Sequence, residues 1–185
     1  MTGHDSSHLV VLRGPSGSGK TSLAQAMRTA RGRGLALVQQ DLLRRTVLRE
    51  RDVPGGANIG LLDLTARYAL DHGFDVVLEG ILDASRYSLM LTDLVRAHRG
   101  TTTVVYLDVP LDETLRRHAG RPQANEFTVA DMRSWYQPGD LLGLPGELTI
   151  DHTTSLPEAT EQILTTTWGG CPAERPLTAA PTGRT

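Results

Sequence analysis

The sequence Gly-Pro-Ser-Gly-Ser-Gly-Lys-Thr occupies residues 14–21. A continuous apolar run at 8–12 precedes it, which is typical of a strand buried on both faces. A helical pattern follows it, with Leu23, Met27 and Ala30 on one side. The glycines permit turns that let several N–H groups converge on one anion, and the helix N-terminus is aimed at the same point. These features predict a phosphate-binding loop between a strand and a helix.

The spacing G-x-x-x-x-G-K-T also assigns chemistry to side chains. Lys20 can reach the β- and γ-phosphates of a nucleotide, and the Thr21 hydroxyl can bind Mg²⁺. Lysine and arginine together number 19, and Lys20 is the single lysine. Its position inside this pattern strengthens the prediction of nucleotide binding. The predicted ATP-binding residues are Gly14, Ser16, Gly17, Ser18, Gly19, Lys20, Thr21 and Ser22.

Length and composition indicate one globular domain. The chain has 185 residues, of which 39% are hydrophobic and 22% charged, enough for a core. A net charge of −2 argues against a broad nucleic-acid surface, and a single cysteine excludes an intrachain disulfide framework. The sequence lacks the roughly 18 continuous apolar residues of a membrane span. It also lacks the apolar core of a signal peptide, so we expect a cytoplasmic protein with no membrane partner.

Strands and helices alternate along the chain. Further strands are expected at 35–39, 76–78, 102–108 and 148–150. Helices are expected at about 19–30, 42–51, 61–71, 84–98, 110–118, 128–137 and 157–168. This order predicts an α/β fold, a doubly wound five-stranded parallel sheet with helices on both faces. We expect one domain over residues 1–168 and a disordered tail at 169–185.

On these residues the chain resembles the small P-loop kinases. Within them it resembles the branch that contains the zeta toxins, gluconate and adenylylsulfate kinases and chloramphenicol phosphotransferase. The resemblance spans about residues 9–168 and is specific at the phosphate loop. It implies an enzyme that uses ATP and Mg²⁺ and transfers the γ-phosphate to a hydroxyl of a small molecule. Nucleic acid is not the expected partner, and the sequence indicates no oligomeric state.

Asp41 is the candidate catalytic base. It follows the strand expected at 35–39, and ligands of doubly wound sheets bind outside the carboxyl ends of the strands. A carboxylate there could accept the proton of an attacking hydroxyl. The resemblance implies the same role, because zeta toxins and chloramphenicol phosphotransferase have a catalytic Asp after this strand. Asp is also a favoured helix N-cap, so a purely structural role is the alternative.

Two arginines are candidates for binding the acceptor. Asp41 and Arg44 form D-x-x-R, which resembles the polynucleotide 5′-hydroxyl kinases, where the arginine holds a substrate phosphate. A nucleoside or polynucleotide 5′-hydroxyl kinase is therefore an alternative function. Arg86 lies one turn into the helix expected at 84–98 and is the second candidate. A helix face that carries Arg44, Arg45, Arg49 and Arg51 is most often simply solvated, and for Arg86 a role in binding and no such role are equally open.

Glu79 is the candidate acid near the metal. The run 76–80 resembles the strand beside the phosphate loop of P-loop kinases, which ends in an acid near the magnesium. Many relatives have Asp there, so Glu79 could orient a metal-bound water rather than bind the metal. The same difference motivates another alternative, a non-catalytic ATP-binding regulatory protein.

The segment at about 116–130 resembles the short arginine-bearing lid of nucleotide kinases. We expect Arg117 and Arg121 to neutralise transition-state charge together with Lys20, and the lid to exclude water. Arg116 is expected to remain solvated. Thr128 and Asp131 have the spacing of a capping box, which predicts the start of the helix at 128–137.

Overall fold

The protein is built around a five-stranded parallel sheet, seen in a computed structural model that describes residues 1–119 and 128–170. The strand order is β2-β3-β1-β4-β5. The five-stranded parallel α/β fold expected from the sequence is therefore confirmed. The strands are β1 (His8–Arg13), β2 (Leu35–Gln39), β3 (Asp75–Glu79), β4 (Thr101–Asp108) and β5 (Leu148–Asp151).

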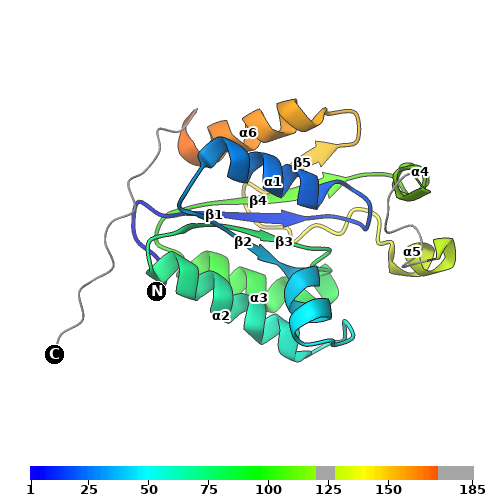
Figure 1. The fold of residues 1–185 in the computed structure, drawn as a ribbon, viewed down its shortest axis with the longest axis horizontal. Helices are drawn as coiled ribbons and strands as arrows, with labels where there is room; N and C mark the ends of the chain where they lie inside the picture. The colour runs from blue at the N-terminus through cyan, green and yellow to red at the C-terminus, as the bar shows by residue number, and fades with distance from the viewer. Residues whose placement is uncertain (120–127, 171–185) are drawn as a thin grey trace.

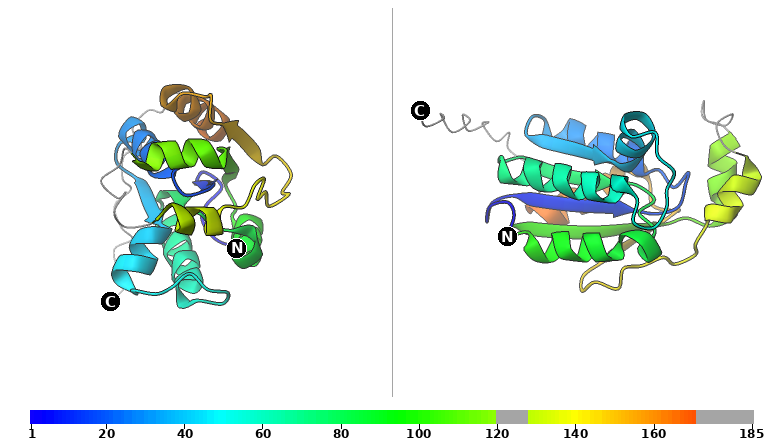
Figure 2. Two further views of the ribbon diagram at one scale, coloured as in Figure 1. Left: turned by 90° about the vertical axis from the view of Figure 1, so that its right-hand side faces the viewer. Right: turned by 90° about the horizontal axis from the view of Figure 1, so that it is seen from below.

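Helices cover both faces of this sheet (Figure 1; Figure 2). One face carries α1 (Lys20–Arg31) and α6 (Leu156–Trp168), and the other carries α2 (Ala57–Asp71) and α3 (Ala84–Ala97). Two shorter helices, α4 (Leu111–Ala119) and α5 (Val129–Trp135), lie beyond the carboxyl ends of the strands (Figure 1). Within residues 1–119 and 128–170, no helix combines the length and hydropathy that a membrane crossing requires.

The central strand β1 belongs to two apolar cores at once. Val10 and Leu12 pack under α1 and α6, whereas Leu9 and Val11 pack against α2 and α3. All four side chains are fully buried, because successive residues of a strand point to opposite faces of the sheet. The carboxyl end of β1 is thus fixed from both sides, and the phosphate loop begins there.

The segment after β2 departs from the sequence prediction. Instead of an α-helix at 42–51, the chain forms a short π-helix, η1 (Leu42–Val47). All six of its residues are at least partly exposed, so core packing does not impose an α-helical period. Arg49 then adopts a left-handed φ of 52°, which ends the helical winding. The expected helix was therefore wrong beyond residue 47.

The helix caps follow the sequence more closely. Thr128 and Asp131 form the predicted capping box at the start of α5. The Asp83 carboxylate accepts the N–H of Ser85 and caps α3. Most of the expected lid, including Arg121, and nearly all of the expected tail lie outside the described residues.

Candidate active site

The phosphate loop connects β1 to α1 at the carboxyl edge of the sheet. Gly19 occupies the cap position of α1 with φ 103°, a conformation that favours glycine, and it has no side chain to cap the helix. The first backbone N–H groups of α1 are therefore available to bind an anion at the N-terminus of the helix. Gly17 has φ 83°, and a Cβ there would lie 2.9 Å from the carbonyl oxygen of Thr114. This close approach of α4 explains why the loop needs glycine at residue 17.

Lys20 is held against the loop itself. Its side chain is buried, and Nζ donates hydrogen bonds to the carbonyl oxygens of Gly14 (2.9 Å) and Pro15 (2.8 Å) and to Ser18 Oγ (3.3 Å). These contacts hold the ammonium group against the backbone of the loop. An anionic ligand bound by the loop would therefore lie beside this positive charge.

A cavity of about 660 Å³, called here the phosphate cavity, opens in front of the loop. It brings together four of the predicted residues, Lys20, Thr21, Asp41 and Glu79, from distant parts of the chain. The loop and α1 supply Ser16, Gly17, Gly19, Lys20, Thr21 and Ser22 to its wall. The rest of the wall consists of Asp41, Leu42, Arg45, Thr46, Glu79, Gly80, Ile81 and His118.

Asp41 occupies the N-cap position of η1, but its side chain makes no capping hydrogen bond. The residue already has helical backbone angles, φ −64° and ψ −37°. Its carboxylate instead pairs with the guanidinium groups of Arg44 (3.0 Å) and Arg45 (3.2 Å). The side chain is 65% exposed at the cavity wall, so a solute can reach it. The cap interpretation is therefore wrong for this structure, and the role of base stays a prediction.

The two arginines predicted to bind the acceptor lie outside the described wall of the phosphate cavity. Arg44 donates to Asp41 and to the carbonyl oxygen of Glu50 (3.3 Å), and Arg45, which the sequence analysis did not single out, lines the cavity instead. Arg86 donates to the carbonyl oxygen of Asp52 (2.8 Å) and to the Asp83 carboxylate (3.3 Å). Both predicted arginines thus hold the segments around the cavity in place.

Thr21 and Glu79 form the predicted pair for a metal. Thr21 Oγ1 donates to Glu79 Oε1 (3.1 Å), and Gln39 Nε2 donates to the same oxygen (2.8 Å). Glu79 is buried at the end of β3. In the described part of the chain, no group of three or more His, Cys, Asp or Glu residues could hold a metal. The pair fits Mg²⁺, because this ion usually takes one or two protein oxygens besides water and phosphate oxygens.

The Gln40 side chain connects the segments that follow β2 and β3. This buried side chain accepts the N–H of Ile81 (2.9 Å) and donates to Tyr87 Oη (2.6 Å). Tyr87 Oη donates in turn to the Asp52 carboxylate (2.6 Å), and burial together with this bond raises the pKa of the Tyr87 phenol. The network fixes the backbone on both sides of the cavity wall. Sequence analysis missed it, because its members are spread over residues 40–87.

The end of α4 lies over the phosphate loop. Arg117 Nη1 donates to the carbonyl oxygen of Ser18 (3.1 Å), and Nη2 donates to that of His152 (3.2 Å). Hydrogen bonds from Arg116 and Arg117 lower the pKa of the Glu113 carboxyl to about 2. Arg116 is 74% exposed, as expected. His118 lines the phosphate cavity; sequence analysis missed it, because its burial, like that of Thr114 four residues earlier, is visible only in the structure.

A second hollow of about 390 Å³, the side cavity, lies between α1 and the segment that follows β5. Gly19 and Ser22 line both cavities, so the two spaces meet at the start of α1. Asp151 Oδ1 accepts the N–H groups of Thr153 (2.8 Å) and Thr154 (3.2 Å), which fixes the backbone at the rim of the side cavity.

The profile of the AAA domain family matches residues 9–138. No curated protein matches the sequence significantly. Among solved structures, the APS kinase of Mycobacterium tuberculosis, in complex with AMPPNP and APS, has a TM-score of 0.66 and 20% identity over 88% of this chain and 98% of that chain. The gluconokinase of Sinorhizobium meliloti has a TM-score of 0.58 and 17% identity, over 89% of this chain and 92% of its own.

The tunicamycin resistance protein of Deinococcus radiodurans is similar over 92% of this chain and 99% of its own, with a TM-score of 0.59 and 22% identity. These likenesses show a shared fold. The family match adds the sequence relationship, because it covers well over half of the chain. The protein therefore belongs to the AAA domain family, with the fold of the P-loop kinases.

Proposed function

We propose that this protein is a kinase that transfers the γ-phosphate of ATP to a hydroxyl group of a small molecule. One observation carries the proposal: Lys20, Thr21, Glu79 and Asp41 line a single cavity. Their chemistry matches the four needs of phosphoryl transfer, which are phosphate binding, a metal ligand, a group to order the metal's water and a proton acceptor.

The nucleotide would lie across the two cavities. The loop N–H groups, Lys20 and the start of α1 hold the β- and γ-phosphates in the phosphate cavity, and the base occupies the side cavity. Mg²⁺, bound by Thr21 with Glu79 beside it, neutralises phosphate charge when present. APS kinase, which shares the fold, was solved in complex with AMPPNP and APS, so a protein of this fold binds a nucleotide of this kind.

The acceptor would approach from the side of η1. Its hydroxyl oxygen attacks the γ-phosphorus, the bond to the β-phosphate oxygen breaks, and ADP leaves. Asp41 accepts the hydroxyl proton; its carboxylate is exposed at the cavity wall and is oriented by Arg44 and Arg45. Lys20 lines the phosphate cavity and stabilises the negative charge that develops there, and Arg117, which donates to the Ser18 carbonyl oxygen beside the junction of the two cavities, assists it.

The alternatives receive less support. A nucleoside or polynucleotide kinase was suggested by Arg44, but this side chain is not part of the described cavity wall, and it donates to the Asp41 carboxylate and to the carbonyl oxygen of Glu50. A regulatory protein without turnover was suggested by Glu79, which nevertheless lies against Thr21. Among the described residues, no further observation favours either function.

The test is ADP release from Mg-ATP, with and without a panel of hydroxyl compounds, for wild type and Asp41→Asn. Acceptor-dependent release is expected to fall about 10²-fold or more in the variant, with ATP affinity unchanged. Asp5→Asn is the matched control, since the Asp5 side chain is 81% exposed and pairs with Arg99 far from the cavity. Equal turnover in Asp41→Asn and wild type would show that Asp41 is not the base.

A further inference from the structure

Helix α4 is packed directly on the phosphate loop. The buried Thr114 contacts the loop through its carbonyl oxygen, which lies 2.9 Å from the position of a Cβ on Gly17. One turn later, Arg117 donates to the carbonyl oxygen of Ser18. Two successive loop residues therefore touch two successive turns of α4, and this fixes the helix relative to the phosphate cavity.

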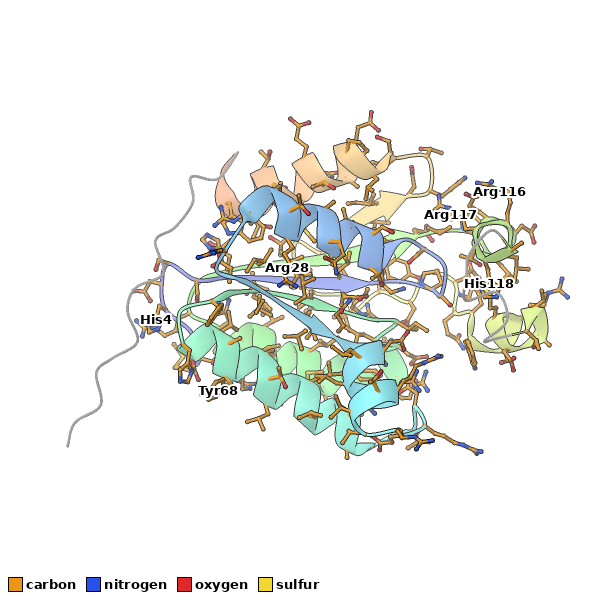
Figure 3. All side chains as sticks on the ribbon, viewed as in Figure 1. His4, Arg28, Tyr68, Arg116, Arg117 and His118 are labelled. Carbon is orange, nitrogen blue, oxygen red and sulfur yellow. The ribbon has the colours of Figure 1, made fainter. Side chains whose placement is uncertain are left out.

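The last turn of α4 presents three consecutive side chains to three different surroundings (Figure 3). Arg116 is exposed to solvent, and Arg117 lines the side cavity. His118 lies on the same helix face as Thr114, four residues away, and it lines the phosphate cavity. His118 is 7% exposed, so it is part of the wall and not a surface residue near it.

The position of His118 within the cavity indicates which part of a nucleotide it would meet. Gly19 and Ser22 mark the junction with the side cavity, where the nucleoside would enter. His118 lines the phosphate cavity, as Lys20 and Asp41 do, and it does not line the side cavity. It therefore belongs to the space assigned to the terminal phosphates.

His118 lies in the last turn of α4, so the electrostatics of a helix end bear on what it can do. The carboxyl end of a helix carries a partial negative charge of about one half, which repels phosphate oxygens. An imidazole keeps at least one N–H donor in either protonation state, so His118 can offset this repulsion with a hydrogen bond. Hydrogen bonds to a charged acceptor are stronger than those between neutral groups.

From this placement we propose that His118 binds the terminal phosphates of the nucleotide through an imidazole N–H and so contributes to the preference for ATP over AMP. The inference rests on the proposed function, because it requires a nucleotide in the phosphate cavity. It adds a phosphate-contacting residue that neither the G-x-x-x-x-G-K-T pattern nor the expected lid arginines include.

The test compares binding of AMPPNP and of AMP, with Mg²⁺, by calorimetric titration of His118→Gln and His118→Met. These replacements have side chains of similar length and good helix propensity, but only Gln carries N–H donors. We expect His118→Met to bind AMPPNP about tenfold more weakly than His118→Gln does, and AMP with about the same affinity. Arg116→Met is the control on the same helix and should bind both nucleotides as wild type does.

Two outcomes would overturn the inference. Equal AMPPNP affinity of the Gln and Met variants would show that no N–H of residue 118 reaches the phosphates. A parallel loss of AMPPNP and AMP binding would indicate a general distortion of the cavity. A wild-type protein that binds neither nucleotide would instead overturn the proposed function itself, so the two failures are distinguishable. Thermal unfolding of each variant verifies that folded proteins are being compared.

Discussion

Thr21 Oγ1 and Glu79 Oε1 are joined by a hydrogen bond of 3.1 Å, which connects the first turn of α1 to the last residue of β3. The same carboxylate oxygen accepts a hydrogen bond from Gln39 Nε2 (2.8 Å) at the end of β2. Three neighbouring elements are thus connected through one buried acid. The hydroxyl predicted to bind Mg²⁺ is thereby held beside the carboxylate predicted to assist it.

We expect Glu79→Gln to weaken the effect of Mg²⁺ on nucleotide binding. Raising MgCl₂ should strengthen AMPPNP binding by the wild type, and the variant should lose about tenfold of this enhancement, because residues that orient a metal's ligands typically contribute this much. Titrations of AMPPNP at several MgCl₂ concentrations measure the effect. Glu161→Gln, at an exposed position on α6, is the control. An unchanged magnesium dependence in Glu79→Gln would remove Glu79 from the metal site.

The part of the site that could be predicted from sequence is local. The loop at 14–21 lies between an apolar run and an amphipathic helix, so its own neighbours determine its conformation. The predicted Lys20, Thr21, Asp41 and Glu79 meet in one cavity because each follows or begins an element at the same edge of a parallel sheet. The alternation of strands and helices along the sequence already implied a parallel sheet. That topology was enough to bring these four residues together.

The part that could not be predicted depends on winding and on distant partners. Whether Arg44 or Arg45 faces the cavity depends on the π-helical winding of η1, which no apolar period in that segment indicates. Arg13 is fully buried only because Asp140 and Glu147, more than 120 residues later, pair with it. Spacing along the chain carries no information about such contacts.

Arg13 is therefore expected to be important for stability. Its guanidinium lies 2.9 Å from the Asp140 carboxylate and 3.4 Å from that of Glu147, and it is fully buried at the end of β1. Removing one partner of such a buried pair costs about 3–5 kcal/mol, because the remaining charge stays desolvated. We expect Arg13→Met to lower the free energy of unfolding by this amount in a urea titration.

The control for Arg13 is an exposed pair of the same type. Arg99 pairs with Asp5 at 2.8 Å, but the two side chains are 43% and 81% exposed. Arg99→Met should change the free energy of unfolding by less than about 1 kcal/mol, because solvent screens exposed pairs. Similar losses in the two variants would mean that the burial of Arg13 does not determine its contribution.

His98 should make the stability of the protein depend on pH. Burial lowers the pKa of its imidazole below the usual 6.5; the nearby His8 adds to this shift, and Asp75 opposes it. Its ring nitrogens contact the hydroxyls of Ser7 (2.8 Å) and Thr102 (2.7 Å). The unfolded chain therefore binds a proton here at a pH at which the folded protein does not.

The sign follows from this difference. The contribution of His98 to stability is fully present above about pH 6.5, and it is lost as the pH falls from there toward the lower pKa of the folded state. Thermal unfolding between about pH 8 and about pH 5 should show a falling midpoint in the wild type and a flatter profile in His98→Gln. The same slope in both proteins would assign the pH dependence to another group.

Gly17 and Gly60 should respond to alanine in opposite directions. Gly17 has φ 83°, and a Cβ would meet the Thr114 carbonyl oxygen at 2.9 Å, so Gly17→Ala strains the loop and pushes against α4. The left-handed conformation alone costs about 1–2 kcal/mol for an L residue. Gly60 lies exposed within α2, and apart from its chain neighbours and the nearby backbone of α2, no described heavy atom lies within 4 Å of its Cβ position. Gly60→Ala should therefore stabilise the fold by up to about 1 kcal/mol.

Urea titration of both variants, combined with AMPPNP titration, separates stability from binding. Gly17→Ala should lower both the free energy of unfolding and the nucleotide affinity, because the strained residue is part of the phosphate loop. Gly60→Ala should raise the free energy of unfolding. It should leave the nucleotide affinity unchanged, because α2 lies outside the described walls of both cavities. If Gly17→Ala bound AMPPNP like the wild type, the close contact between α4 and the loop would not be required for nucleotide binding.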